Sequence, residues 1–178
     1  DAHRHVLDCF PENPAEIIDI GSGTGRDAAF LAAQGHRVLA VEPTHALRNA
    51  AMALHPSSRI EWIDDSLPNL DKIANRVSKF DLVLMAAVWM HLDQAEREQA
   101  MPIVASLLKT GGLLIMNLRH GPVPKGRRMF EIPDKEMLEL AGKYRLFPIH
   151  QQNEGSILKR NQDAGVTWSR FVFRKTEP

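Results

Sequence analysis

Acidic residues and glycines are concentrated in one short segment, Glu16–Asp27, which reads EIIDIGSGTGRD. Its isoleucines are typical of a short buried strand. Gly21, Gly23 and Gly25 follow at alternate positions, and glycine lets the backbone adopt positive φ angles and approach a ligand closely. A strand, a glycine-rich turn and a helix in this order form the ligand-facing turn of a doubly wound α/β sheet. The segment therefore predicts a ligand beside the turn.

Acidic side chains also follow the next two segments that we expect to be strands. Glu42, followed by Pro43, ends the second strand, and a carboxylate there can accept hydrogen bonds from both hydroxyls of a ribose. Asp65 and Ser66 follow the third strand, where a carboxylate can accept a hydrogen bond from an adenine amine. Ligands of such sheets bind outside the carboxyl ends of the strands, so these residues and the glycine turn are expected at one cleft.

The ends of the fourth and fifth expected strands supply the remaining candidates. Ala86 is small enough for the backbone to face a ligand, and His91 is a candidate base or substrate contact. Trp89 is a candidate pocket wall. Arg119 and His120, after the fifth strand, are candidate substrate contacts. Each of these residues also has a structural interpretation as a packed, capping or solvated side chain.

Strands and helices alternate along the chain, which indicates a mostly parallel sheet. Asp93 and Glu96 form a capping box at the start of one helix. We expect Pro102 to kink or divide this helix, and Gly111 and Gly112 to end it.

The two ends of the chain complete the expected fold. Residues 3–10 are expected to form the end of a leading helix. Asp134 is expected to cap a last helix, and strands are expected at 145–151 and 166–174. Pro148 lies in the first of these strands, which favours a place at the edge of the sheet because proline lacks an amide donor.

Size and composition are those of one globular domain covering residues 1–178. The chain is 44% apolar and 25% charged with a formal net charge of zero, so no overall field attracts nucleic acid or an anionic membrane. No segment is long and apolar enough to span a membrane, and the single cysteine, Cys9, excludes an internal disulfide. We therefore expect a cytoplasmic protein. Because the chain starts at Asp1 rather than methionine, we expect an N-terminal segment to be missing.

Five segments, in order, resemble the motifs of the class I S-adenosylmethionine-dependent methyltransferases. The resemblance is to members of this family that act on small molecules, and the family has a Rossmann-like fold. The first has G-x-G-x-G spacing, where dinucleotide-binding folds have G-x-G-x-x-G. The resemblance extends from Glu16 to Arg174. The matching segments are IIDIGSGTG, VEP, WIDDSLP, FDLVLMAAVWMHL and LLKTGGLLIMNLR.

The resemblance implies a doubly wound α/β fold with a mostly parallel seven-stranded sheet, an antiparallel strand near one edge and helices on both faces. It implies S-adenosylmethionine as cofactor and methyl transfer by in-line displacement. Asp19 would orient the glycine turn and the amino group of the methionine moiety, Glu42 would hold the ribose, and Asp65 the adenine. The cofactor-binding candidates are Asp19, Gly21, Ser22, Gly23, Gly25, Asp27, Glu42, Pro43, Asp65, Ser66 and Ala86.

The resemblance does not identify the methyl acceptor. The motifs of amino-methylating DNA enzymes, of cytosine-C5 enzymes and of arginine methyltransferases are missing, so a small-molecule acceptor remains and nucleic acid is disfavoured. No metal site and no particular oligomeric state are predicted. His91 is the candidate catalytic base, and the candidate substrate contacts are Trp89, His91, Arg119 and His120.

Two other functions fit parts of the sequence. A non-catalytic module that binds S-adenosylmethionine would use the same cofactor residues. The loop at 119–133 distinguishes the two, because an open acceptor pocket under it favours an enzyme and a filled one favours a binding module. A nicotinamide-dependent oxidoreductase would use Glu42 for its ribose, but the glycine spacing and the lack of a Tyr-x-x-x-Lys pair disfavour it.

Overall fold

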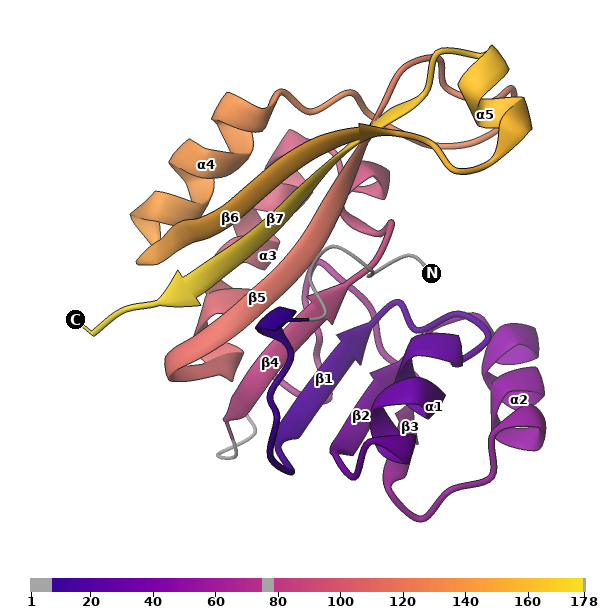
Figure 1. Cartoon of the computed structure of the whole chain (residues 1–178), viewed down its shortest axis with the longest axis vertical. Helices are drawn as coiled ribbons and strands as arrows, with labels where there is room; N and C mark the ends of the chain where they lie inside the picture. Colours follow the sequence, from indigo (N-terminus) through magenta and orange to yellow (C-terminus); the bar gives the residue numbers. More distant parts are fainter. Residues whose placement is uncertain (1–7, 75–78, 178) are drawn as a thin grey trace.

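The computed structural model describes residues 8–74 and 79–177, so most of the expected leading helix at 3–10 lies outside the described residues. Strands and helices alternate along most of the described chain (Figure 1). The strands are β1 (Glu16–Ile20), β2 (Arg37–Val41), β3 (Ile60–Ile63), β4 (Phe80–Met85), β5 (Leu108–His120), β6 (Leu146–Gly155) and β7 (Thr167–Lys175). The helices are α1 (Arg26–Ala33), α2 (His45–Leu54), the 3-10 helix η2 (Trp89–His91), α3 (Gln94–Leu107), α4 (Asp134–Lys143) and α5 (Lys159–Asp163).

Within the described residues, the strands form one seven-stranded sheet in the order β3-β2-β1-β4-β5-β7-β6. The first five strands in this order are parallel, while β7 runs antiparallel to both β5 and β6. Strand β6, which contains Pro148, lies at the edge of the sheet. This architecture confirms the doubly wound, mostly parallel fold expected from the sequence.

Side chains alternate between the two faces of the sheet, and each face has its own apolar core. On β4, Val83 packs on the face covered by α3 and α4, while Leu82 packs on the face covered by α1 (Figure 1). On β5, Met116 and Ile115 divide between the same two faces. Strands buried on both faces read as nearly continuous apolar runs, which is why β1, β4 and β5 were visible in the sequence.

Several details of the expected fold differ in the structure. Asp134 is the first residue of α4, whose N-cap is Pro133, and the short helix α5 follows α4. Pro102 lies inside α3 and starts no second helix, and α3 ends at Leu107 rather than at the glycine pair. Gly111 and Gly112 lie inside β5, at a register shift against β4. A side chain at Gly112 would place Cβ 2.9 Å from the carbonyl oxygen of Lys109, so the pair allows an irregular strand rather than a helix end.

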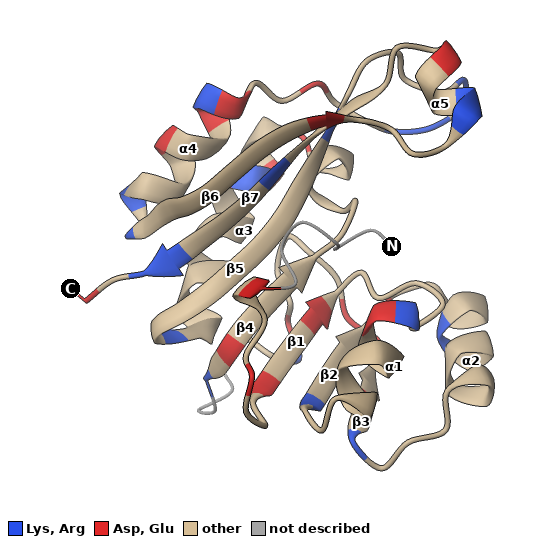
Figure 2. Ribbon diagram, viewed as in Figure 1, with Lys and Arg blue, Asp and Glu red and all other residues tan. Residues whose placement is uncertain are grey.

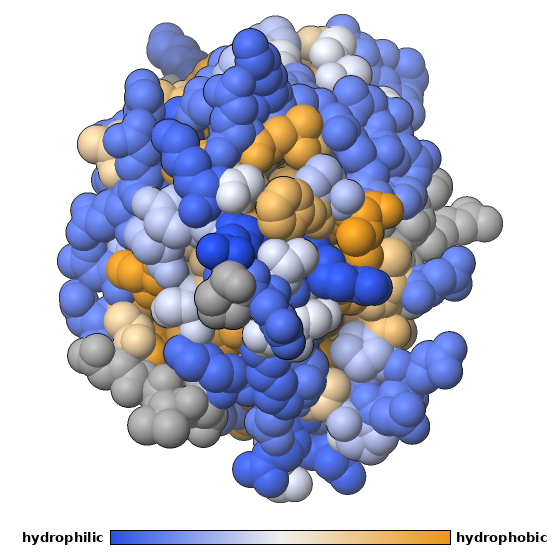
Figure 3. Space-filling view, turned by 90° about the vertical axis from the view of Figure 1, so that its left-hand side faces the viewer, coloured by the Kyte–Doolittle hydropathy of each residue, from blue (hydrophilic) through white to orange (hydrophobic). Residues whose placement is uncertain are grey.

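On the side that carries α4 and β6, hydrophilic residues surround small apolar patches (Figure 3). Exposed apolar residues of β6 include Phe147 and Ile149. Among the described residues, no helix is both long and apolar enough to cross a membrane.

Candidate active site

The glycine turn connects β1 to α1, and its three glycines serve different purposes. Gly21, Gly23 and Gly25 all have positive φ angles, of 76°, 56° and 75°. A Cβ at Gly21 would lie 2.4 Å from Val88 Cγ2, and one at Gly25 would lie 2.4 Å from Trp62 Cη2. At Gly23 the same Cβ would have no neighbour within 4 Å among the described residues. The absence of a side chain at Gly25 therefore has a packing reason, the contact with Trp62, and its predicted role at the cofactor stays a prediction.

A cavity of about 380 Å³, which we call the glycine-turn pocket, lies beside this turn. Asp19 lines it although only 2% of the residue is exposed, and its Oδ2 atom has no hydrogen-bond partner among the described residues. The Oγ atom of Ser22 is likewise buried and without a partner in the described chain. Two residues that line one cavity thus each have a buried, unpaired polar atom, which fits a polar ligand there because leaving such atoms unpaired is costly. The other lining residues include Gly21, Thr24, Arg26, Asp27, Ala86, Ala87, Asn117, Ser156, Ile157, Leu158, Asn161, Trp168 and Arg170.

The electrostatics of this pocket favour a cationic ligand group. Burial, with a smaller contribution from the carboxylates of Asp27 and Glu42, raises the pKa of Asp19 from its ordinary 3.8 to about 8. A positive group beside Asp19 would relieve both effects. Although several carboxylates converge, no group of three acidic, histidine or cysteine side chains that could hold a metal ion occurs in residues 8–74 and 79–177.

A second cavity, of about 440 Å³, lies at the ends of β1, β2 and β3, and we call it the acidic pocket. Glu42 and Asp65 line it, and no lysine or arginine does so among the described residues. The Glu42 carboxylate accepts hydrogen bonds from the amides of Gly23 at 2.9 Å and Thr44 at 2.8 Å. Both carboxyl oxygens are thus held by the backbone and still have free lone pairs. Glu42 therefore links the glycine turn to the start of α2.

Asp65 is fixed in a similar way. Its Oδ1 atom accepts a hydrogen bond from the amide of Ser66 at 2.9 Å, and its Oδ2 atom accepts one from the amide of Lys72 at 2.8 Å. Pro43 and Ser66, both predicted cofactor contacts, also line the acidic pocket. These contacts hold both predicted ligand carboxylates in fixed positions.

A third cavity, of about 600 Å³, lies under the loop that follows β5, and we call it the arginine pocket. It is lined by arginine, aromatic and apolar side chains, and by His91 at its boundary with the acidic pocket. Figure 2 shows Lys or Arg positions on α5 and on the loop that passes beside it. The lining residues are Ala87, Met90, His91, Arg119, Pro122, Val123, Pro124, Arg127, Met129, Leu158, Arg160, Asn161, Ala164 and Trp168.

The three cavities meet at Ala87, which lines all of them. Ala87 has a φ of 58°, in the left-handed region that a residue with a side chain seldom adopts. Its amide donates a hydrogen bond to Oδ1 of Asn117 at 2.7 Å, across 30 residues of sequence. Asn117 thus stabilises the strained backbone that follows β4, at the point where the cavities join.

His91 lies between the acidic pocket and the arginine pocket and is half-buried. Its Nδ1 atom is 2.8 Å from the carbonyl oxygen of Arg128. A carbonyl oxygen only accepts hydrogen bonds, so this contact assigns the proton of the neutral ring to Nδ1. The Nε2 atom then carries a lone pair that can accept a proton or a hydrogen bond.

The predicted substrate contact at Trp89 is wrong. The residue is 0% exposed and belongs to the core on the α3 and α4 face of the sheet, and it lines none of the three pockets. The stretch that follows β4 turns into the short helix η2, and this turn directs the indole inward while leaving His91 at the cavities.

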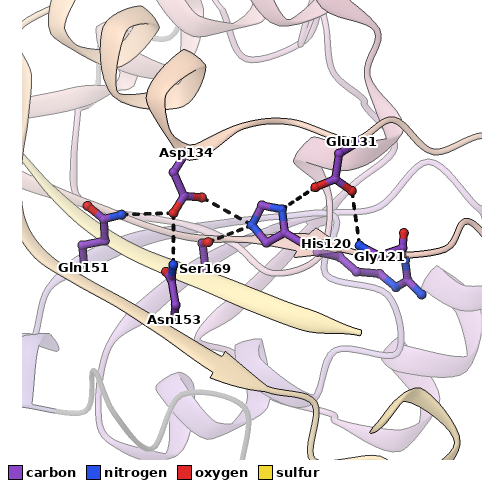
Figure 4. A network of polar contacts seen from close by, with 8 residues as sticks. His120, Gly121, Glu131, Asp134, Gln151, Asn153 and Ser169 are labelled. Carbon is purple, nitrogen blue, oxygen red and sulfur yellow. Dashed lines mark hydrogen bonds and ion pairs between the residues drawn. The ribbon is translucent and has the colours of Figure 1, made fainter. Parts of the chain in front are cut away.

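His120 lines none of the three pockets, because β5 places neighbouring residues on opposite faces. Arg119 shares a face with Asn117 and lines the arginine pocket, whereas His120 points toward α4. There its imidazole contacts Glu131 at 2.6 Å, Asp134 at 3.3 Å and Ser169 at 2.7 Å (Figure 4). His120 thereby ties the loop after β5 to the start of α4.

The sequence analysis missed the contribution of β7 and of the segment that joins β6 to β7. Trp168 and Arg170 of β7 line the glycine-turn pocket, together with Leu158 and Asn161 from the segment between β6 and β7. Arg170 forms an ion pair with Glu154 of β6. Trp168 and Arg170 are separated by two positions and therefore share one face of β7. This spacing was the feature of the sequence that could have identified them.

Comparisons with known proteins agree with this geometry. A family model described as "Methyltransferase domain" matches residues 17–112, more than half of the chain. An uncharacterized methyltransferase of Mycobacterium tuberculosis is 30% identical over 125 residues, which cover 69% of this chain and 48% of that protein. Glycine N-methyltransferase of Oryctolagus cuniculus is 27% identical over 136 residues, which cover 64% of this chain and 46% of that protein. The chain thus spans about half the length of the curated relatives that it matches.

Solved structures of low identity share the fold over almost the whole chain. One is the 1,6-didemethyltoxoflavin-N1-methyltransferase of Burkholderia thailandensis with bound 1,6-didemethyltoxoflavin and S-adenosylhomocysteine. It has a TM-score of 0.77 at 23% identity, covering 99% of this chain and 75% of that one. Another is the magnesium protoporphyrin IX methyltransferase of Synechocystis with bound S-adenosylmethionine, with a TM-score of 0.73 at 15% identity, covering 96% of this chain and 74% of that one.

Proposed function

The chain belongs to the class I S-adenosylmethionine-dependent methyltransferase family, and from this premise we propose that it transfers a methyl group from S-adenosylmethionine to a small-molecule acceptor. The observation that carries the proposal is the junction of three cavities at Ala87. Two of these cavities have the chemistry to hold the two ends of a nucleoside-linked amino acid, and the third is free for an acceptor.

In this proposal the acidic pocket holds the nucleoside. Glu42 accepts hydrogen bonds from the ribose hydroxyls, since each of its oxygens retains a lone pair after binding one backbone amide. Asp65 accepts from the adenine amine in the same way. Because both carboxylates are held before the ligand arrives, little conformational freedom is lost on binding.

The glycine-turn pocket holds the amino-acid end. The carboxylate of Asp19 has one unpaired buried oxygen, and a cationic amino group beside it would favour the charged form of the acid. Ser22 supplies a second unpaired polar atom, its Oγ. The unpaired atoms of Asp19 and Ser22 could thus bind the zwitterionic amino-acid end of S-adenosylmethionine, and this fit supports the cofactor assignment.

When bound, S-adenosylmethionine supplies a methyl group on a cationic sulfur, which keeps the electron pair of the broken carbon–sulfur bond. The chain's own contribution is alignment and exclusion of water at Ala87. The Nε2 atom of His91 can accept a proton from the acceptor where the acceptor must lose one, because Nδ1 is already committed to the carbonyl of Arg128.

The alternatives from the sequence are less well supported. The loop after β5 lies over an open cavity of about 600 Å³, which supports an enzyme over a module that only binds the cofactor. Family membership argues against a nicotinamide-dependent oxidoreductase. We also propose a cytoplasmic location, since the single cysteine, Cys9, requires no oxidising compartment.

Isothermal titration tests the proposal. We expect saturable binding of S-adenosylmethionine and of S-adenosylhomocysteine, and no binding of NAD. Incubation with methyl-labelled S-adenosylmethionine and pooled small-molecule fractions should then transfer label to a low-molecular-weight product. Absence of binding by S-adenosylmethionine would defeat the proposal.

A further inference from the structure

The arginine pocket differs in charge from the other two cavities. Three arginines, Arg119, Arg127 and Arg160, line it, and no aspartate or glutamate does so among the described residues. The acidic pocket has the opposite composition, with two carboxylates and no lysine or arginine in its described lining. A cavity with cationic walls and no internal counter-charge attracts anions.

Two of these guanidinium groups are available to a ligand. Arg127 and Arg160 are exposed, and neither side chain has an ion-pair or hydrogen-bond partner within the described chain. Nearby acids are already engaged, because Glu131 contacts His120 and Asp163 pairs with Lys159. The neighbouring Arg128, in contrast, is paired with carboxylates.

Arg128 shows what a structural arginine looks like in the same loop. Its guanidinium contacts Asp93 at 2.9 Å and Glu96 at 2.8 Å, and it does not line the pocket. Among the described residues, the third pocket arginine, Arg119, donates only to the carbonyl oxygens of Gly121 at 3.3 Å and Pro122 at 2.9 Å. No carboxylate of the described chain therefore pairs with it in the wall of the pocket.

The remaining wall of the arginine pocket is apolar. Met90, Val123, Met129, Leu158 and Trp168 all line it. Trp168 is half-buried, and its indole offers an aromatic surface to a flat ligand. A ligand that satisfies both the arginines and this wall carries an anionic group on an apolar body.

From this arrangement, and resting on the proposed function, we infer that the methyl acceptor is an apolar or aromatic small molecule bearing an oxyanion, either a carboxylate or a phosphate. The three arginines line only the arginine pocket, whereas Ala87 and His91 also line the neighbouring cavities. The oxyanion therefore anchors the acceptor, and a different atom of the acceptor faces the methyl group beside Ala87. Arginine is suited to this role because its planar fork pairs with two oxygens at once.

Probe binding tests the inference without knowledge of the acceptor. Protein saturated with S-adenosylhomocysteine is titrated with benzoate, phenyl phosphate and benzamide, and binding is followed by nuclear magnetic resonance. We expect benzoate or phenyl phosphate to bind at least about tenfold more tightly than the uncharged benzamide, since charged hydrogen bonds to arginine are lost in the amide. The tighter of the two anions identifies the oxyanion class.

A pair of double variants assigns that binding to the pocket. Arg127→Gln with Arg160→Gln removes two lining charges, and we expect roughly a 25-fold loss of anion affinity, about fivefold for each exposed arginine. Lys125→Gln with Lys143→Gln removes the same charge at two exposed positions outside the pocket lining and leaves the Lys159–Asp163 pair intact, and we expect no loss.

Three results would overturn the inference. These are benzamide binding as tightly as the anions, no saturable binding of either anion, and equal losses in the two double variants. Failure of the proposed function gives a different signature, because S-adenosylhomocysteine itself would then not bind. Its affinity is expected to be the same in both double variants.

Discussion

The acidic pocket and the arginine pocket are built in opposite ways. In the acidic pocket, Glu42 and Asp65 are nearly buried and each carboxyl oxygen is held by a backbone amide. In the arginine pocket, Arg127 and Arg160 are exposed and have no partner within the described residues. The acidic pocket is thus preorganised for a single ligand, while the guanidinium groups of Arg127 and Arg160 in the arginine pocket are left available to bind one. This difference is what we expect of a domain that uses one donor and that can change its acceptor by changing loop residues.

The largest effect should come from Glu42. Glu42→Gln replaces one carboxyl oxygen by an amide group that cannot accept from a backbone N–H, so either Gly23 or Thr44 loses its partner. We expect S-adenosylmethionine affinity to fall by about 100-fold, measured by titration calorimetry. The exposed Glu12→Gln variant serves as control. Unchanged affinity in Glu42→Gln would show that the fixed carboxylate of the acidic pocket does not matter for binding, and the proposed difference between the two pockets would then fail.

The rigidity of the donor side can be tested on two glycines of the same turn. Gly25→Ala combines an unfavourable positive φ with a contact of 2.4 Å to Trp62, and we expect it to lower the free energy of unfolding by about 3 kcal/mol. Gly23→Ala meets no atom within 4 Å in the described chain, so only the backbone term of about 1 kcal/mol applies. Urea denaturation measures both. Equal losses would show that the packing against Trp62 is unimportant.

Asp19, in the glycine-turn pocket, should make the stability of the protein depend on pH. Its pKa of about 8 lies above its ordinary value of 3.8, so the folded protein binds more protons than the unfolded chain between these values. The contribution of Asp19 to stability is therefore complete below about pH 4 and is lost as pH rises toward 8. Asp19→Asn should flatten this part of the stability profile, in which each pH unit costs up to about 1.4 kcal/mol. Denaturation of both proteins at several pH values checks the slope, and parallel profiles would contradict the assignment.

The smallest effect on ligand binding should come from His120. His120→Ala removes contacts with Glu131, Asp134 and Ser169 on the α4 face, and we expect a stability loss of about 1 kcal/mol. S-adenosylhomocysteine affinity and benzoate affinity should stay within twofold of the wild type, which calorimetry and magnetic resonance titrations measure. Loss of benzoate binding at unchanged stability would instead indicate that His120 contacts the acceptor.

Much of the donor side could be predicted from the sequence because its residues are local. Asp19, the three glycines and Asp27 lie within one strand, turn and helix start, and Glu42 ends the next strand. Parallel strands bring these ends to one edge of the sheet without further information. The acceptor side could not be predicted as well. Arg119 lines the arginine pocket, but Trp89 lies in the core, His120 contacts the start of α4, and Trp168 and Arg170 were missed.

The sequence by itself determined the order of strands and helices, the glycine turn and the acidic ends of β2 and β3, because periodicity and turn chemistry act over a few residues. Only the tertiary structure decided which side chains face the third cavity. The antiparallel register of β5 with β7 pairs Arg119 with Trp168, residues that are distant in sequence, and strand alternation then separates Arg119 from His120. That register depends on packing against both cores, which no local pattern of the chain encodes.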